Sequence, residues 1–374
     1  MKVKNNYQPK HKKESKVKIM PTSLQRINPE VELFISAILS AKSQTIQNRT
    51  TLYDHYEWTL SVDNVVKSLI SKRINAASSK KYHLYVDDDL FLEDFFEAPR
   101  FKQFLGDIIM SKFWGFHTYE LLVNEFRGRK WFDYYLIPNK HINPYSREIL
   151  YNQFDRQGVP FDNFANILFI GDNDDLGLLL NIVLLSLYRR YGHFAYSNYL
   201  DLASENFARI VGTGEEDPAD VSYVQQQMKN RGAGGSVHLP PDTQLQLENQ
   251  SSSSQNQLFE NYVKTIKDEL AILILGQTMT TEDGSSRSQA EVHQEEQDTV
   301  FSADDNTILD VLNYEVIDYL WLWDIPQVEG LNFRKTVTKE TELKEKLNNF
   351  NLLKDLGVLF TDEEIRKHFE DLLT

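Results

Sequence analysis

Two clusters of carboxylates are the first candidates for chemistry in the sequence. They are Asp87–Asp89 in "VDDDLF" and the acidic run of "GDNDDLG" at 171–177. Calcium and magnesium prefer carboxylate oxygens, but a calcium loop of the EF-hand type needs a Glu at its twelfth position. Counted from Asp172, that position holds Val183. Because Asp is also common in turns and helix caps, we expect solvated turns or caps and no metal site.

Motifs for phosphate binding, zinc binding or nucleophilic catalysis give even weaker signals than the two carboxylate clusters. The glycine-rich "RGAGGS" at 231–236 is not followed by the Lys-Ser/Thr of a phosphate-binding loop, so we expect a turn there. No two of the nine His have the spacing of a zinc-binding helix, and no Gly-x-Ser-x-Gly occurs. The chain has no Cys, which excludes disulfides, thiolate nucleophiles and Cys-ligated metals. We therefore expect no enzyme activity and no cofactor.

A polar segment stands out between two helical patterns. The apolar run "LAILIL" at 270–275 leads directly into "GQTMTTEDGSSRSQAEVHQEEQ" at 276–297, which has few apolar residues. Such a segment cannot offset its own ordering entropy by burial. Its part at 280–287 contains four hydroxyls, two neighbouring carboxylates and one cation: Thr280, Thr281, Ser285, Ser286, Glu282, Asp283 and Arg287.

Charge is divided unevenly along the chain of 374 residues, whose net charge is −15. The first 19 residues hold seven Lys and one Glu, so the remainder carries −21. An acidic body argues against a protein that grips nucleic acid across its surface, but it permits one that lets nucleic acid slide past. The start lacks the apolar stretch of a signal peptide. The longest apolar run, Leu176–Leu187, is about 12 residues, where a membrane span needs about 20.

Hydrophobic periodicity predicts an α+β unit over 29–170. Helices are predicted at 29–44 and at 63–77, the second capped by Ser61 or Asp63. Alternation predicts a strand at 82–86 and two hairpins, which turn near Arg127–Gly128 and near 156–158.

The second half is dominated by long helices. The first extends from Leu176 to about Ala208, with Asp174 or Asp175 as its cap and Gly192 as its weak point. A small αβ insertion and the linker "NQSSSSQNQ" follow, and two further helices flank the polar segment. The apolar stripes of the first two helices contain Leu187, Tyr191, Phe194 (at the edge of its stripe), Tyr199, Tyr262 and Ile266.

This order of elements resembles the portal proteins of tailed bacteriophages, and local motifs narrow the resemblance to the Mu-like portals. The motifs are "WGFHTYELLV" at 114–123, "ENFARIVG" at 205–212 and "ILGQTMTTEDGSSRSQAEVH" at 274–293. The resemblance covers about 63–324. The chain departs from the family at Val123, where the family has Trp, and at Ala208 and Ile210, where Gly and Pro are expected.

The resemblance implies a helix-dominated α+β portal fold assembled as a ring. Its expected parts are a basic arm (1–28), an α+β wing (29–173), a first stem helix (174–208), an αβ clip with its linker (209–254), a second stem helix (255–277), a tunnel loop (278–288), a long wing helix (289–326) and a short crown (327–374).

The implied function is a portal vertex in the virion, with a ring of 12 copies around a channel for double-stranded DNA. The resemblance places the seven polar residues at 280–287 in the channel and the six apolar stripe residues at the subunit interface. A docking surface for the terminase large subunit and the head-tail adaptor is expected on the clip, at Gln225, Gln226, Lys229, Asn230 and Arg231. Major capsid and scaffold proteins are further expected partners. No contact with a membrane is expected. The alternatives are another ring-forming connector or adaptor and, less favoured, a nucleic-acid-processing enzyme.

Overall fold

The computed structural model describes most of the chain between residues 29 and 336. The described residues are 29–43, 48–87, 89–92, 98–126, 128–204, 207–211, 222–223, 226, 244–248, 253–277, 287–336 and 347. The basic arm predicted at 1–28 and most of the predicted crown lie outside them.

Helices make up most of the described chain. They are α1 (Pro29–Lys42), α2 (Thr50–Val62), α3 (Asn64–Ser78), α4 (Pro99–Trp114), α5 (Leu179–Ser204), α7 (Ser253–Leu275) and α8 (Arg287–Tyr314), with 3-10 helices η1 (Asn139–His141), η2 (Phe161–Asn163) and η3 (Val316–Trp323).

The strands form small antiparallel sheets ordered β4-β3-β8, β11-β1-β2, β5-β6-β7 and β10-β9. They are β1 (Tyr82–Val86), β2 (Asp89–Leu92), β3 (Phe116–Phe126), β4 (Arg129–Ile137), β5 (Ile142–Asn143), β6 (Glu148–Ile149), β7 (Val159–Pro160), β8 (Ile167–Gly171), β9 (Phe207–Val211), β10 (Gln244–Glu248) and β11 (Leu331–Lys335). The pairing of β1 with β11 joins the first part of the chain to residues more than 240 positions later, because Tyr82 lies opposite Lys335.

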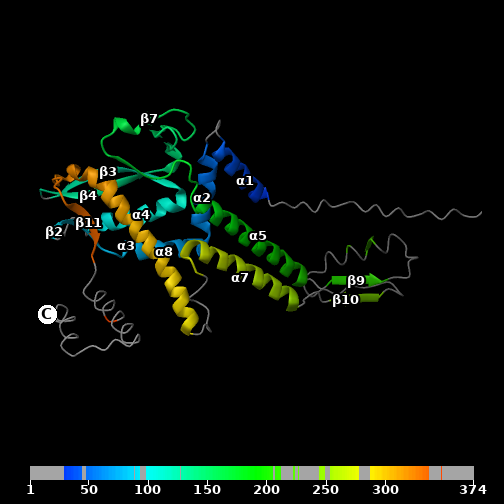
Figure 1. Ribbon diagram of the computed structural model, residues 1–374. Coiled ribbons are helices and arrows are strands. Elements are labelled where there is room, and N and C mark those ends of the chain that lie inside the picture. The colour runs from blue at the N-terminus through cyan, green and yellow to red at the C-terminus, as the bar shows by residue number, and fades with distance from the viewer. Residues whose placement is uncertain are drawn as a thin grey trace, which may run out of the picture.

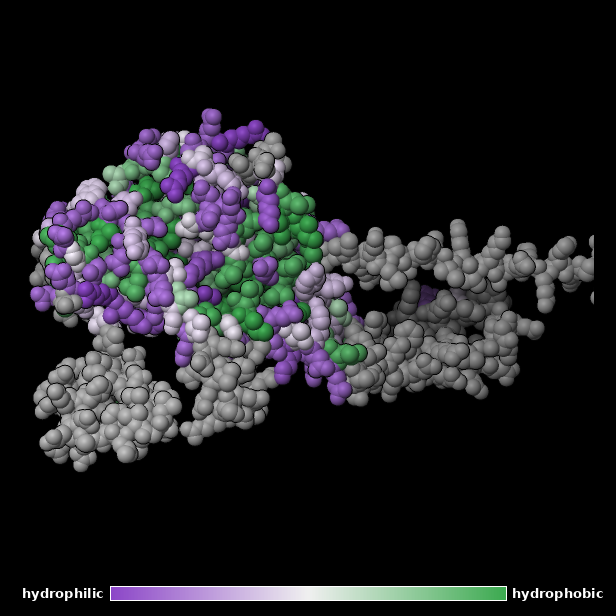
Figure 2. All heavy atoms as spheres, in the orientation of Figure 1, coloured by the Kyte–Doolittle hydropathy of each residue, from purple (hydrophilic) through white to green (hydrophobic). Residues whose placement is uncertain are grey.

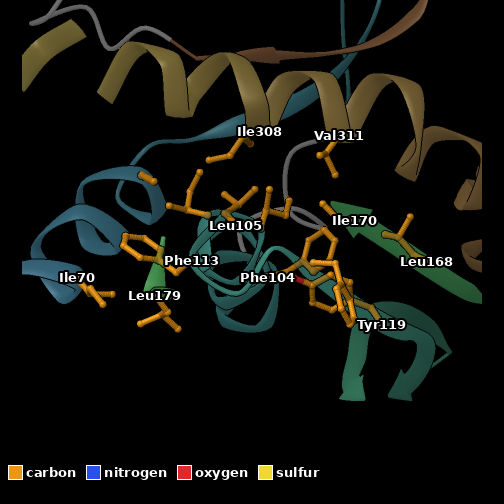
Figure 3. Packing of buried hydrophobic residues seen from close by; sticks show 14 of the residues in the cluster. Ile70, Phe104, Leu105, Phe113, Tyr119, Leu168, Ile170, Leu179, Ile308 and Val311 are labelled. Carbon is orange, nitrogen blue, oxygen red and sulfur yellow. The ribbon is translucent and has the colours of Figure 1, made fainter. Parts of the chain in front are cut away.

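Helix α4 lies at the centre of the hydrophobic core (Figure 3). Its Phe104 packs against Tyr119 of β3 and Phe132 of β4, with ring centroids 5.2 Å and 5.1 Å apart. From the opposite side, Ile308 and Val311 of α8 point towards the same core. The core is therefore complete only when α8, from the last third of the chain, packs on α4.

Three glycines bring the chain together where α4 ends, β8 ends and α5 is about to begin. Gly115, Gly171 and Gly177 have φ values of +92°, +120° and +74°, which disfavour a side chain. A Cβ on Gly115 would lie 2.3 Å from the carbonyl oxygen of Asp175, and one on Gly177 would lie 2.2 Å from that of Phe113. This glycine junction therefore packs backbone directly against backbone.

The helices α5 and α7 lie side by side and extend away from the body, whereas α8 crosses the body over α3 and α4 (Figure 1). The small β9-β10 pair lies beyond the far end of this helix pair.

Several local predictions agree with the structure. Asp63 caps α3, because its Oδ1 accepts hydrogen bonds from the backbone N–H of Val65 and Val66 at 3.0 and 3.1 Å. The hairpin predicted on both sides of 127–128 is β3-β4, with Thr118 opposite Ile137.

Other predictions were wrong. The first long helix begins at Leu179 and not at Leu176, and neither Asp174 nor Asp175 caps it. Asp172 and Asp175 instead close tight turns, because they accept from the N–H of Asp174 and Gly177. The helix also ends earlier, at Ser204.

The second predicted hairpin, at 149–170, forms only as a short pair of strands around 150–158. Strand β6 pairs with β7, whereas β8 joins β3 in a different sheet. Helix α7 begins at Ser253, inside the predicted linker, and α8 ends at Tyr314, where η3 takes over.

Candidate functional site

The pair of long helices is the first part of the candidate site. At their crossing a Cβ on Gly192 of α5 would lie 2.5 Å from Cε1 of Tyr262 of α7. The Tyr262 hydroxyl donates a hydrogen bond to the carbonyl of Tyr188 at 3.1 Å. Gly192 is the residue predicted to be a weak point of the helix. Because it has no side chain, the ring of Tyr262 can pack against α5 at this position and link α7 to α5.

Further along the pair, stacked aromatic rings continue the contact. Tyr196 of α5 and Phe259 of α7 lie with ring centroids 3.9 Å apart and planes 5° apart. The ring of His193 meets Phe259 edge-on at 5.6 Å. These contacts extend the side-by-side packing beyond the hydrophobic core of the body.

The six predicted stem-interface residues occupy different environments. Leu187 and Ile266 are buried in the hydrophobic core of the chain itself, and Tyr262 bridges the two helices. Tyr191 is exposed, and Phe194 has 64% of its surface exposed. Tyr199 lies in α5, with its side chain outside the described part. The single chain thus leaves Tyr191 and Phe194 open on α5.

A second exposed apolar region lies next to α5. Leu33, Ile35 and Leu39 of α1 are exposed, and α1 contacts both α2 and α5. Figure 2 shows apolar residues gathered around α1 and the neighbouring start of α5. Exposed apolar patches of this kind often mark contacts with another protein.

The base of the polar segment is the second part of the site. Helix α7 ends at Leu275, and Gly276 follows with a φ of +79°. The next residue, Gln277, is buried and donates from Nε2 to Oε1 of the buried Gln297 of α8 at 2.7 Å. This amide pair closes the segment across its base.

A buried ionic cluster holds both helices that border the segment. Arg73 of α3 donates from Nε and Nη2 to the two carboxylate oxygens of Asp304 of α8, at 2.7 and 2.8 Å. Its Nη1 donates to the carbonyl of Ile274 near the end of α7, at 2.9 Å. Lys112 of α4 adds a third contact to Asp304 at 2.9 Å. Burial by itself raises the pKa of Asp304, but Arg73 and Lys112 outweigh it and hold that pKa below its ordinary value.

The neighbouring Asp305 ties α8 to the sheet of β1 and β11. Its carboxylate contacts Nζ of Lys80 at 2.5 Å and Nζ of Lys335 at 2.8 Å, and it accepts from the hydroxyl of Tyr82 at 3.1 Å. Burial and the adjacent Asp305 both raise the pKa of Tyr82. The arrangement anchors α8 to this sheet.

These anchoring residues were missed in the sequence analysis, although a signal was present. Arg73 follows Val66 and Ile70 on the buried side of α3, and Asp304 precedes Ile308 by four residues on α8. A charged residue on an apolar helix face requires a partner.

Most of the predicted DNA-contact and docking residues lie outside the described residues. These are Thr280, Thr281, Glu282, Asp283, Ser285 and Ser286 of the polar segment, and Gln225, Lys229, Asn230 and Arg231 of the insertion. Arg287 begins α8, with its side chain outside the described part, and Gln226 is helical and exposed.

No group of three or more His, Asp or Glu able to hold a metal ion occurs among the described residues. In the same part of the chain, no helix is both long and apolar enough to cross a membrane.

Comparison with known proteins places the chain in a family. A family described as "Portal protein of Mu bacteriophage" matches residues 53–371. The chain belongs to this family. Portal proteins are structural components of a particle, and the resemblance seen in the sequence motifs is thereby confirmed.

Two solved structures are similar to the chain at low sequence identity. The neck of an empty GTA particle, computed with C6 symmetry, has a chain that is 12% identical with a TM-score of 0.50, covering 84% of this chain and 91% of that one. A portal protein of the HK97 family from Corynebacterium diphtheriae is 10% identical with a TM-score of 0.45, covering 74% and 93%. No curated protein matches the chain significantly.

Proposed function

We propose that this portal-family chain is the portal vertex subunit of a phage or phage-like particle, where a ring of copies forms the channel for packaging and ejecting double-stranded DNA. The observation that carries the proposal is the family match over 53–371, which includes both long helices and the whole polar segment. The chain is then a virion component with a structural role.

The exposed apolar residues support assembly into a ring. Tyr191 and Phe194 of α5, with Leu33 and Leu39 of α1, offer a surface that a neighbouring copy would cover. Identical subunits that meet through two different surfaces close into a ring when the rotation between them closes. We propose twelve copies, as in the resemblance, with α5 and α7 as the stem.

The polar segment would line the channel. Its two ends are fixed by the Gln277–Gln297 pair and by Arg73, so the loop between them would project from a rigid base. The hydroxyls of Thr280, Thr281, Ser285 and Ser286 would face phosphates, Glu282 and Asp283 would repel them, and Arg287 would attract them. Few contacts of mixed sign suit sliding better than holding.

The αβ insertion would be the clip. We propose that Gln225, Gln226, Lys229, Asn230 and Arg231 form its docking face, first for the terminase large subunit and later for the head-tail adaptor. The wing, which contains α1 to α4 and the β4-β3-β8 sheet, would contact major capsid and scaffold proteins.

Measurement of the assembly mass tests this proposal. The purified full chain should form a closed ring of about a dozen copies by native mass spectrometry, with a central channel in negative-stain micrographs. A chain that stays monomeric at every concentration would contradict the portal assignment. A ring whose channel is too narrow for a DNA duplex would contradict the proposed channel.

A further inference from the structure

Strand β4 is the outer strand of the β4-β3-β8 sheet, and no described strand pairs with its other side. Its sequence, "RKWFDYYLI", holds four aromatic residues and is longer than a typical strand of about five to six residues. Aromatic residues favour strands, and a long apolar edge offers its N–H and C=O groups to any other strand. The edge of β4 is therefore a potential site of pairing between copies of the chain.

The register shows which backbone groups of β4 face this outer edge. Along an antiparallel pair, residues that exchange backbone hydrogen bonds alternate with residues that do not. Phe126 and Arg129 lie opposite each other with two residues between them in the sequence, so this pair exchanges hydrogen bonds. Counted from this pair, Tyr134 is a residue whose N–H and C=O point away from β3, towards the outer edge.

Two side chains occupy both of these groups. The N–H of Tyr134 donates to Oδ1 of Asp133 at 2.8 Å, and Nη2 of Arg100 donates to the carbonyl of Tyr134 at 2.7 Å. The Nε of Arg100 donates to the same Oδ1 of Asp133, also at 2.7 Å, and its guanidinium lies 4.8 Å from the centre of the Tyr134 ring. We call this arrangement of Arg100 and Asp133 around Tyr134 the edge clasp.

The same kind of contact occurs on two other outer strands. In β11 the N–H of Phe333 donates to Oδ1 of Asn313 at 2.7 Å, and Nδ2 of Asn313 donates to the carbonyl of Phe333 at 3.0 Å. In β8 the carbonyl of Ile167 accepts from the hydroxyl of Tyr319 at 2.7 Å. Side chains from three different helices thus cover edge groups in two sheets, which argues against a chance contact at β4.

We propose that the edge clasp closes β4 to strand addition, and that the strand it excludes is β4 of a second copy of this chain. An incoming strand needs the N–H and C=O of Tyr134, so it must displace two hydrogen bonds that each involve a charged side chain. Tyr135 is 54% exposed, and two copies of β4 paired antiparallel would bring aromatic side chains together. With the edge clasp formed, copies meet through surfaces other than this edge.

Titration of a fluorescently labelled peptide tests the proposal by anisotropy. The peptide has the sequence of residues 129–137, and it is titrated with the full chain as wild type, as Arg100→Met and as Asp133→Ala. Each variant should bind the peptide at least about tenfold more tightly than wild type, which is the usual worth of one hydrogen bond to a charged group. Equal binding by all three proteins, or binding by none of them, overturns the proposal.

Two controls separate the strand edge from charge and from general adhesion. Lys102→Met removes one exposed cation from the first turns of α4 but leaves the edge clasp intact, so it should bind the peptide no better than wild type. A peptide with Pro at the position of Tyr134 should not bind the variants, because proline disrupts a paired strand. If Lys102→Met binds as tightly as Arg100→Met, charge and not the edge clasp controls binding, and the proposal is wrong.

Thermal melting and hydrogen exchange complete the test. The side chains of Arg100 and Asp133 are 50% and 26% exposed, so loss of their ion pair should leave the melting temperature near that of wild type. In Asp133→Ala the N–H of Tyr134 should exchange faster than in wild type, and the bound peptide should slow it again. If the bound peptide leaves exchange in β4 unchanged, it lies elsewhere on the chain, and the edge clasp does not guard this strand.

Discussion

The variant Asp304→Asn tests whether the buried ionic cluster anchors α8. Asn keeps the shape of the side chain but removes its charge. The change leaves Arg73, with 9% of its side chain exposed, and Lys112 without their counter-charge. Arg73 would still donate to Ile274, but a carbonyl does not neutralise a buried guanidinium.

The expected loss follows from the geometry. Both Asp304 oxygens are engaged by Arg73 at 2.8 Å or less, and the carboxylate is 1% exposed, so solvent screening is weak. Removal of one partner from such a pair destabilises a protein by about 3–5 kcal/mol. The same change at Asp305 should cost less, about 1–2 kcal/mol, because Lys80 and Lys335 are more exposed and can turn to water.

Urea denaturation of the two variants measures the difference, and hydrogen exchange of α8 locates it. Because the pKa of Asp304 is held below its ordinary value, its contribution is complete above about pH 4 and disappears as pH falls. The wild-type and Asp304→Asn stabilities should therefore converge in acid. The double variant Arg73→Met/Asp304→Leu should regain much of the loss. Equal midpoints for Asp304→Asn and Asp305→Asn at neutral pH would refute the reasoning.

Three further predictions concern the helix pair and the polar segment. Gly192→Ala should separate α5 from α7 and destabilise the chain by about 1–3 kcal/mol, a loss that Tyr262→Ala should partly suppress in a double-mutant cycle of unfolding free energies. Phe194→Ala should lower the temperature at which rings dissociate without changing the urea midpoint of the monomer; the reverse pattern would place Phe194 in the subunit's own fold. Replacement of Glu282 and Asp283 by Lys should shorten the DNA packaged per particle, more at low salt than at high, and wild-type packaging at low salt would show that the loop does not face DNA.

The sequence predicted elements whose signals are local. Asp63 before an apolar helical pattern predicted the start of α3, and alternation on both sides of Gly128 predicted β3 and β4. Helix α4 was not anticipated, although Pro99 at its first turn and the spacing of Phe101, Phe104 and Leu105 are typical of a helix start.

Features that depend on distant residues could not be predicted in this way. Arg73 and Asp304 are 231 residues apart, and the sequence around one residue does not reveal that the other is its partner. The buried Arg49 likewise donates to the carbonyl of Asp175, which lies 126 residues later in the chain. In the segment 149–170 the alternation of apolar and polar residues did indicate strands. Which strands pair is decided by contacts with other parts of the chain, as when β8 joins β3.

The glycine junction at Gly115, Gly171 and Gly177 helps to set the angle at which helix α5 leaves the body. Helix α5 begins two residues after Gly177 and is about 39 Å long at 1.5 Å per residue. An error of one degree at its start would move its far end by about 0.7 Å. Because backbone packs directly against backbone at the junction, the main chain itself limits this angle. Copies of the chain would therefore point their helix pairs in the same direction with little variation, which is the tolerance that a closed circular assembly requires.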